Sequence, residues 1–117
     1  MINQYNGDGA VRQPNWKRWE VILLVDMYYR IKNESLNVMD ECQKLSSFLR
    51  RSNLDNSLQS STYRNVRGIV MKYYNIQHLV EGIGLSARSK LDVEIVDYYN
   101  TDYDSFQQEL NIILSCS

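Results

Sequence analysis

The chain has 117 residues, which is enough for one domain with one hydrophobic core. Hydrophobic residues make up 44% and charged residues 23%, as in an ordinary soluble globular protein. The net charge of −1 argues against a strong autonomous binder of nucleic acid, and the two distant cysteines exclude a disulfide framework or a cysteine-built metal site. No apolar run approaches membrane-spanning length and no signal region opens the chain, so we expect a cytoplasmic protein with no membrane partner.

The charges are unevenly distributed along the chain. Up to Asn75 there are eleven Lys and Arg against seven Asp and Glu, whereas from Ile76 onward there are two against seven. A nucleic acid would be attracted to the first part and repelled by the second. Alternatively, the two parts attract each other within the fold.

Residues 1–13 are polar and contain two glycines, which predicts a flexible lead-in to a single helical domain over residues 14–117. Pro14 and Asn15 mark the start of the first helix, expected from about residue 16 to residue 32. Apolar side chains cover most of its circumference, so this helix should be the buried hub of the fold.

The hub helix carries two acidic residues, Glu20 and Asp26, that need a basic or hydrogen-bonding partner if they are buried. The sequence does not choose among three candidates: Arg64, Arg67 and Lys72.

The second helix is expected from about Val38 to Arg50, with Asn37 as its N-cap and Cys42 in its apolar stripe. Arg50 and Arg51 suit the negative end of the helix dipole, an interpretation that we favour over phosphate binding. A polar loop over residues 53–62 follows.

The stretch from Tyr63 to Leu79 predicts an amphipathic third helix, with either Asn65 or Thr62 as its cap. Its apolar stripe consists of Val66, Ile69, Val70, Tyr73 and Ile76. Lys72 lies on the flank, and the opposite face carries Arg64, Arg67, Gly68, Met71, Asn75 and His78. Such a helix fits a nucleic-acid groove, but an ordinary surface helix has the same pattern.

Two further helices complete the prediction. Gly82 and Gly84 indicate a tight turn, after which Ser89 should cap a helix from about residue 90 to residue 99, with Asp92 placed as in a capping box. The fifth helix is expected from about residue 105 to residue 115. Strand patterns are scarce, so the predicted fold is all-α, a compact bundle of about five helices with a helix-turn-helix-like core.

Catalytic chemistry has little support in the sequence. The single histidine, His78, has no accompanying nucleophile motif and no cysteines near it in sequence, and its place near a helix end has a plain electrostatic explanation. No phosphate-binding loop or nuclease motif appears. We therefore expect a protein that is not an enzyme and that uses no cofactor and no metal.

Three blocks of residues carry a resemblance to a known family. The first contains Trp16, Glu20, Leu23, Leu24, Asp26, Tyr28 and Arg30; the second runs Tyr63-Arg64-Asn65-Val66 with Gly68, Ile69, Lys72, Asn75 and Ile76; the third joins Gly84-Leu85-Ser86 to Ser89-Lys90-Leu91-Asp92. In this order, spanning about residues 16–99, they resemble the helical domain that precedes the nuclease module in bacterial HNH-type restriction endonucleases. A more distant likeness is to Myb/SANT-like DNA readers.

The chain departs from that family at several points. Lys17 stands where the family has a capping residue, and Trp19 stands where it has an acidic residue. Arg67 stands where a small polar residue is common. No HNH motif occurs, so the family's catalytic residues have no counterpart here. The resemblance implies a non-catalytic module, either a piece of a restriction nuclease or a free-standing relative.

The first hypothesis is a DNA-binding accessory module that contacts DNA with the helix over residues 65–79. Arg64, Arg67 and Lys72 would contact phosphates, Asn75 and Asn65 would read base edges, and Gly68 would let the backbone approach DNA or, alternatively, pack against another helix. Ser86, Ser89 and Lys90 would add a phosphate clamp; simple helix capping is the competing explanation there.

The alternative hypothesis is a protein-interaction module or small regulator or inhibitor that binds no nucleic acid of its own. It would dock a partner protein or a linked nuclease domain, or form a homodimer. The acidic C-terminal part and the nine tyrosines suit a protein partner.

Overall fold

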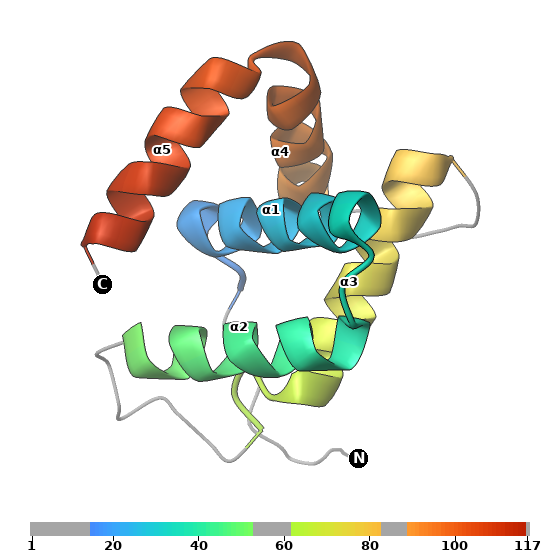
Figure 1. Ribbon diagram of the computed structural model, residues 1–117, viewed down its shortest axis with the longest axis vertical. Coiled ribbons are helices and arrows are strands. Elements are labelled where there is room, and N and C mark those ends of the chain that lie inside the picture. The colour runs from blue at the N-terminus through green and yellow to red at the C-terminus, as the bar shows by residue number, and fades with distance from the viewer. Residues whose placement is uncertain (1–14, 53–61, 83–88, 117) are drawn as a thin grey trace, which may run out of the picture.

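A computed structural model describes residues 15–52, 62–82 and 89–116, which form five α-helices (Figure 1). Their bounds are Arg18–Glu34 for α1, Val38–Ser52 for α2, Val66–Glu81 for α3, Lys90–Thr101 for α4 and Tyr103–Ser115 for α5. The described residues contain no strand, so the predicted all-α fold of five helices is confirmed. The expected lead-in over residues 1–13, Pro14 and Gly84 lie outside the described residues, and the helix-turn-helix-like core stays a prediction.

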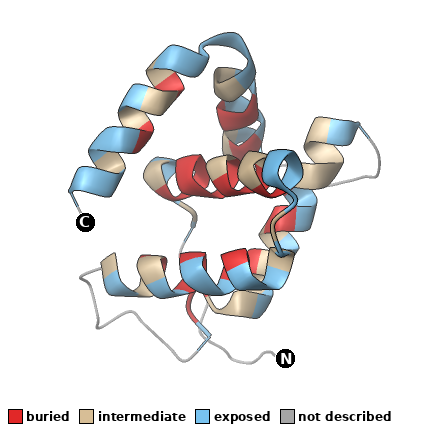
Figure 2. Cartoon of the chain, in the orientation of Figure 1, coloured by how far each residue is buried: buried red, intermediate tan, exposed pale blue. Residues whose placement is uncertain are grey.

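Helix α1 is the hub of the fold, as its composition predicts. It contacts each of the other four helices, and its middle turns are buried almost all round (Figure 2). Val21, Ile22, Leu24 and Val25 are fully buried. Burial of such side chains is the main source of stability, at roughly 1.5–3 kcal/mol each.

The other helices form two pairs on α1. Helices α2 and α3 contact each other on one side, whereas α4 and α5 form a V on the other (Figure 1). Between α4 and α5 the connection is a single residue: the Asp102 N–H donates to the Tyr98 carbonyl at 2.9 Å, and the Asp102 carboxylate accepts from the Ser105 N–H at 3.3 Å. The gap left between the two expected helices, residues 100–104, is therefore reduced to a sharp elbow at Asp102.

Capping residues in the sequence account for most of the remaining helix ends. The Asn37 side chain accepts from the Asp40 N–H at 2.9 Å, and Cys42 is fully buried, as expected for both residues. Gly82 ends α3 with a φ of 70°, in the left-handed region that glycine adopts without strain. These caps fix where α3 begins and ends, and thereby which of its side chains reach the surface.

Candidate interaction surface

Arg64 lies outside the helix to which the sequence assigned it. Helix α3 begins at Val66 with Asn65 as its N-cap, and Arg64 itself has a left-handed φ of 44°. Its side chain therefore leaves the outer face of α3 and points into the molecule, where 2% of it is exposed. This burial argues against the phosphate contact predicted for Arg64, because the guanidinium has little exposed surface.

The buried Arg64 guanidinium is matched to the Glu20 carboxylate. Nη2 and Nε donate to the two carboxylate oxygens at 2.9 and 3.1 Å, and Nη2 also donates to the Asn15 carbonyl at 3.0 Å. The Trp16 and Tyr63 rings lie 4.5 and 4.8 Å from the guanidinium carbon. Of the three candidate partners for Glu20, Arg64 is the one that binds it. This pair joins α1 to the segment before α3 and is structural.

Lys72 also serves the fold. Its Nζ donates to Asp92 Oδ2 at 2.7 Å, with side chains that are 16% and 5% exposed, and so ties α3 to α4. Asp92 was expected to close a capping box. Only its backbone N–H takes part in the cap, donating to Ser89 Oγ at 3.2 Å, because the carboxylate turns to Lys72. Because Lys72 is largely covered and paired with Asp92, its side chain is less available for the phosphate contact that we predicted.

Capping explains two further residues that we predicted to bind nucleic acid. Asn65 Oδ1 accepts from the Gly68 N–H at 2.8 Å, and a Cβ at position 68 would lie 3.2 Å from the same oxygen. Gly68 therefore makes room for the cap, which is a packing role. Ser89 caps α4, Lys90 beside it is exposed, and Ser86 lies outside the described residues.

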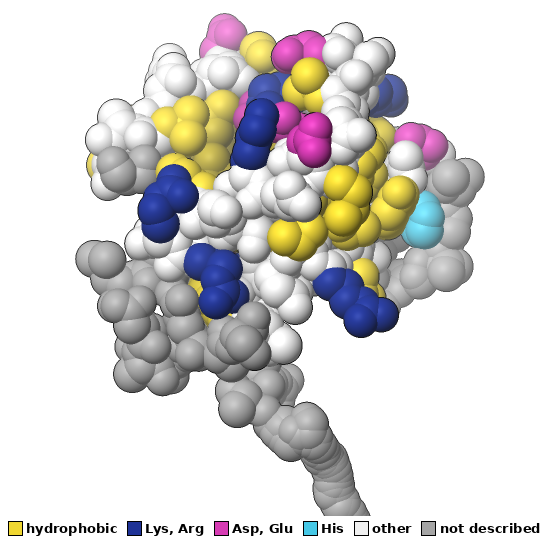
Figure 3. Space-filling model, turned by 60° about the horizontal axis from the view of Figure 1, so that its bottom comes forward, with side chains coloured by type: hydrophobic (Ala, Val, Ile, Leu, Met, Phe, Trp, Pro, Cys, Tyr) yellow, Lys and Arg dark blue, Asp and Glu magenta, His cyan; other side chains and the backbone are white. Residues whose placement is uncertain are grey.

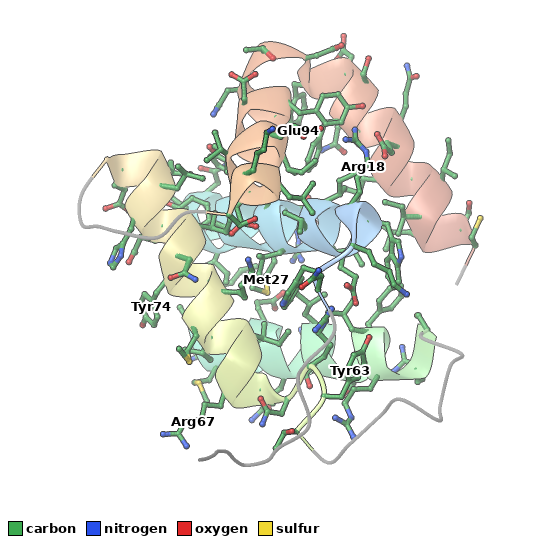
Figure 4. All side chains as sticks on the ribbon, turned by 180° about the vertical axis from the view of Figure 1, so that it is seen from behind. Arg18, Met27, Tyr63, Arg67, Tyr74 and Glu94 are labelled. Atoms are coloured by element: carbon green, nitrogen blue, oxygen red, sulfur yellow. The ribbon has the colours of Figure 1, made fainter. Side chains whose placement is uncertain are left out.

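What remains on the surface of α3 is a row of side chains that we call the outer stripe: Arg67, Met71, Tyr74, Asn75 and His78. Spacings of three and four residues place them on one face of the helix. Met71 is 64% and Tyr74 45% exposed, Arg67 and Asn75 are exposed, and His78 is half-buried. In Figure 4, Arg67 and Tyr74 both point outward from α3.

Tyr74 is held in place from beneath. Its ring meets the buried Tyr73 ring edge-on, with centroids 5.0 Å apart, and Tyr73 in turn contacts Tyr28 of α1 at 5.6 Å. The Tyr28 hydroxyl donates to Glu81 at 3.2 Å, and burial of this ring raises its pKa. Tyr74 is thus an exposed aromatic side chain on a rigid support.

A hollow lies next to the stripe, at the start of α3. It has a volume of about 340 Å³, with Trp16 and Asn65 among its walls and Gly68 on the helix side. Arg67 and Met71 border it as well. The surface therefore combines a protruding apolar side chain with a recess, a shape that can interlock with another molecule. Figure 3 shows hydrophobic side chains gathered beside the histidine on one face of the molecule, with a basic side chain at their edge.

Charge on the outer stripe comes from Arg67. Among the described residues, no ion pair engages Arg67, and the stripe itself contains no carboxylate. Sequence reasoning placed Met71 on this face without giving it a role and missed Tyr74. The recurrence of positions 67, 71, 74 and 78 was the signal that could have found it.

No group of three or more metal-ligating side chains occurs among the described residues. Within the same residues, no helix is both long and apolar enough to cross a membrane. Comparison with protein-family models, with curated proteins and with solved structures yields no match.

Proposed function

We propose that the protein is an interaction module that docks a partner protein through the outer stripe of α3. The observation that carries the proposal is the exposure of Met71 and Tyr74, at 64% and 45%, beside the hollow at the start of the helix. Methionine, tyrosine and arginine are enriched in protein interfaces, and aromatic and arginine side chains supply most hot spots. Phosphate binding has less support, because two of the four basic side chains assigned to it, Arg64 and Lys72, are paired with carboxylates and largely covered.

The chemistry of the stripe defines the partner. An apolar recess would receive Met71 and Tyr74, a projecting side chain would fill the hollow beside Trp16, and a carboxylate would pair with Arg67. A nuclease domain, linked or separate, is the partner class that the resemblance to HNH endonucleases implies. Because Tyr74 packs on the Tyr73 ring, which in turn contacts Tyr28, ordering of the Tyr74 side chain adds little to the cost of docking.

The test begins with a photo-crosslinking amino acid at position 74 in the source cells, followed by identification and purification of the cross-linked protein. Calorimetric titration of the purified pair should give a stoichiometric complex. Met71→Asp should weaken it by at least about tenfold, because a charge would be forced into an apolar contact. Val93→Asp is the matched control: Val93 is 42% exposed on α4 and should leave affinity unchanged. Equal effects of the two variants would reject the proposal.

DNA binding is a second candidate, favoured by one observation: Arg67 and Asn75 are both exposed on the same face of α3, two turns apart. Here Arg67 would contact phosphate and Asn75 a base edge. Fluorescence anisotropy with duplex DNA at low salt tests this reading. DNA binding predicts an affinity that falls as the salt concentration rises and that is weaker for Arg67→Ala than for wild type. Met71→Asp is the variant that tests the protein partner instead.

A further inference from the structure

A second surface feature lies on the opposite side of the molecule from α3, between α2 and α5. Among the described residues, no Cα of α2 comes within 8 Å of a Cα of α5, because both helices rest on α1 without meeting (Figure 1). The groove between them has a volume of about 370 Å³. Residues of α1, α2 and α5, and Cys116 at the end of α5, line it: Trp19, Phe48, Ser52, Ile112, Ile113 and Cys116.

The walls of this groove are apolar and firmly supported. Three of the lining side chains pack against the hydrophobic core: Trp19, Phe48 and Ile113. Ile112 projects with 62% of its surface exposed, although it lies next to them. An apolar channel between helices is the shape that receives the apolar row of an amphipathic helix, at spacings of three, four and seven residues.

One positive charge lies beside the Phe48 wall of the groove. The Arg51 guanidinium carbon lies 5.8 Å from the centroid of the Phe48 ring, and this side chain is exposed. Glu109 on the α5 side shares the Arg18 guanidinium with Glu94. Its carboxylate accepts from Arg18 at 2.9 Å and from the Tyr98 hydroxyl at 3.0 Å, and the Arg18 hydrogen bond lowers its pKa. A ligand with carboxylates beside its apolar row therefore fits best.

We propose that the groove between α2 and α5 binds an amphipathic, acidic helix of a partner protein. Its apolar row would lie against Trp19, Phe48 and Ile112, and a Glu or Asp would face Arg51. This site is separate from the outer stripe, since no Cα of α3 comes within 8 Å of a Cα of α5 among the described residues. A single copy of the protein could then hold two partners at once.

The two cysteines provide a direct assay. Cys116 lines the groove and is exposed, whereas Cys42 is fully buried and burial raises its pKa to about 11, so a thiol reagent should react with Cys116 alone. The probe is a synthetic helical peptide with leucines at three- and four-residue spacing, flanked by glutamates. Binding of this peptide to the full chain should slow the Cys116 reaction by at least about tenfold, since a bound helix covers the groove.

Variants identify where the probe binds. Ile112→Asp should weaken peptide binding by at least about tenfold, and Arg51→Ala by about threefold. Met71→Asp on the outer stripe and Val93→Asp on α4 should bind the peptide normally. Because Met71→Asp tests the stripe alone, failure of either surface can be told from failure of the other.

Several outcomes would overturn the proposal. One is equal or tighter binding of a peptide with lysines in place of the glutamates, and another is unchanged binding to Ile112→Asp. A Cys116 that reacts slowly in the free chain at every dilution would show that the chain's own residues cover the groove. Slow reaction at high protein concentration alone would show that a second copy does so.

Discussion

Arg64 and Arg67 are three residues apart and have opposite surroundings. Arg64 is buried against Glu20 and joins α1 to the start of α3, whereas Arg67 projects from the outer face with no carboxylate on its stripe. The difference arises at Asn65, where the N-cap begins the helix and sets the direction of every later side chain. The same type of side chain is therefore buried in an ion pair on one side of the cap and exposed on the other, where our proposal assigns it to recognition.

Lys72 and Met71 repeat the contrast one turn later. Lys72 turns inward to Asp92, while Met71 lies 64% exposed. Two cations of this segment thus lie inside and a long apolar side chain lies outside, the reverse of what hydropathy alone leads one to expect.

The largest effect should come from breaking the buried pair. Arg64→Ala leaves the fully buried Glu20 carboxylate without its cation, and we expect a loss of about 3 to 5 kcal/mol in the free energy of unfolding. Urea denaturation followed by circular dichroism measures it. Arg67→Ala is the matched control and should change stability by less than about 0.5 kcal/mol. Similar losses for both variants would refute the contrast between the two arginines.

A smaller loss is expected at the link between α3 and α4. Lys72→Ala removes the hydrogen-bond donor to Asp92, whose side chain is 5% exposed. Asp92 Oδ1 already has no hydrogen-bond partner among the described residues. Leaving this carboxylate unsatisfied should lower the free energy of unfolding by about 2 to 3 kcal/mol. Lys90→Ala, which changes an exposed lysine nearby, is the control in the same urea titrations. A stability equal to wild type in Lys72→Ala would show that this link contributes nothing.

Asn65→Ala separates capping from recognition. Loss of the bond from the Gly68 N–H should destabilise the protein by about 1 kcal/mol. Asn65→Asp retains an accepting oxygen and should recover most of that loss, as thermal unfolding will show. If Asn65→Ala kept full stability but lost binding of a nucleic acid, the side chain would be a reader of bases.

The weakest effect concerns an exposed ion pair. Arg18 donates to Glu109 at 2.9 Å, and this hydrogen bond, opposed in part by burial, lowers the pKa of Glu109 below its ordinary value of 4.5. Because the pKa of Glu109 is lower in the folded state, its ionised carboxylate stabilises the protein at pH values above the unfolded-state pKa. That contribution is lost as the pH falls below about 4.5. Because both side chains are partly exposed, it should stay under about 1 kcal/mol.

Comparing unfolding of wild type and Arg18→Gln between pH 7 and pH 3, at low and high salt, tests this. The difference between the two proteins should shrink with acid and with salt. The Glu20–Arg64 pair, being buried, should respond little to salt. A difference between wild type and Arg18→Gln that grows in acid would contradict the assigned pKa direction.

The sequence was sufficient to predict the helices but not to predict which side chains lie on the surface. Periodicity located five helices, with most ends within about two residues, and composition identified α1 as the hub, because burial of apolar faces is encoded locally. It also named Arg64 among the possible partners of Glu20. Its error was to place Arg64 on the outer face of the helix, since either Thr62 or Asn65 could have been the cap.

Long-range pairs could not be predicted in the same way. Lys72 meets Asp92 across 20 positions in sequence, and only the packing of α3 against α4 brings them together. Once Arg64 and Lys72 are taken by carboxylates, the outer stripe of α3 changes in character from basic to mixed, with Met71 and Tyr74 beside a single arginine. The ring contacts that support Tyr74 likewise depend on how Tyr73 packs against Tyr28 of another helix, although the helical spacing of position 74 was visible in the sequence.

The elbow at Asp102 has a consequence for binding kinetics. A connection of one residue has no slack, and the stacked rings of Tyr29 and Tyr99, 3.9 Å apart, brace it against α1. Helix α5 is therefore held at a set angle before any ligand arrives. A ligand of the groove should meet a rigid receptor, so its association rate should be independent of any opening step and rise linearly with ligand concentration.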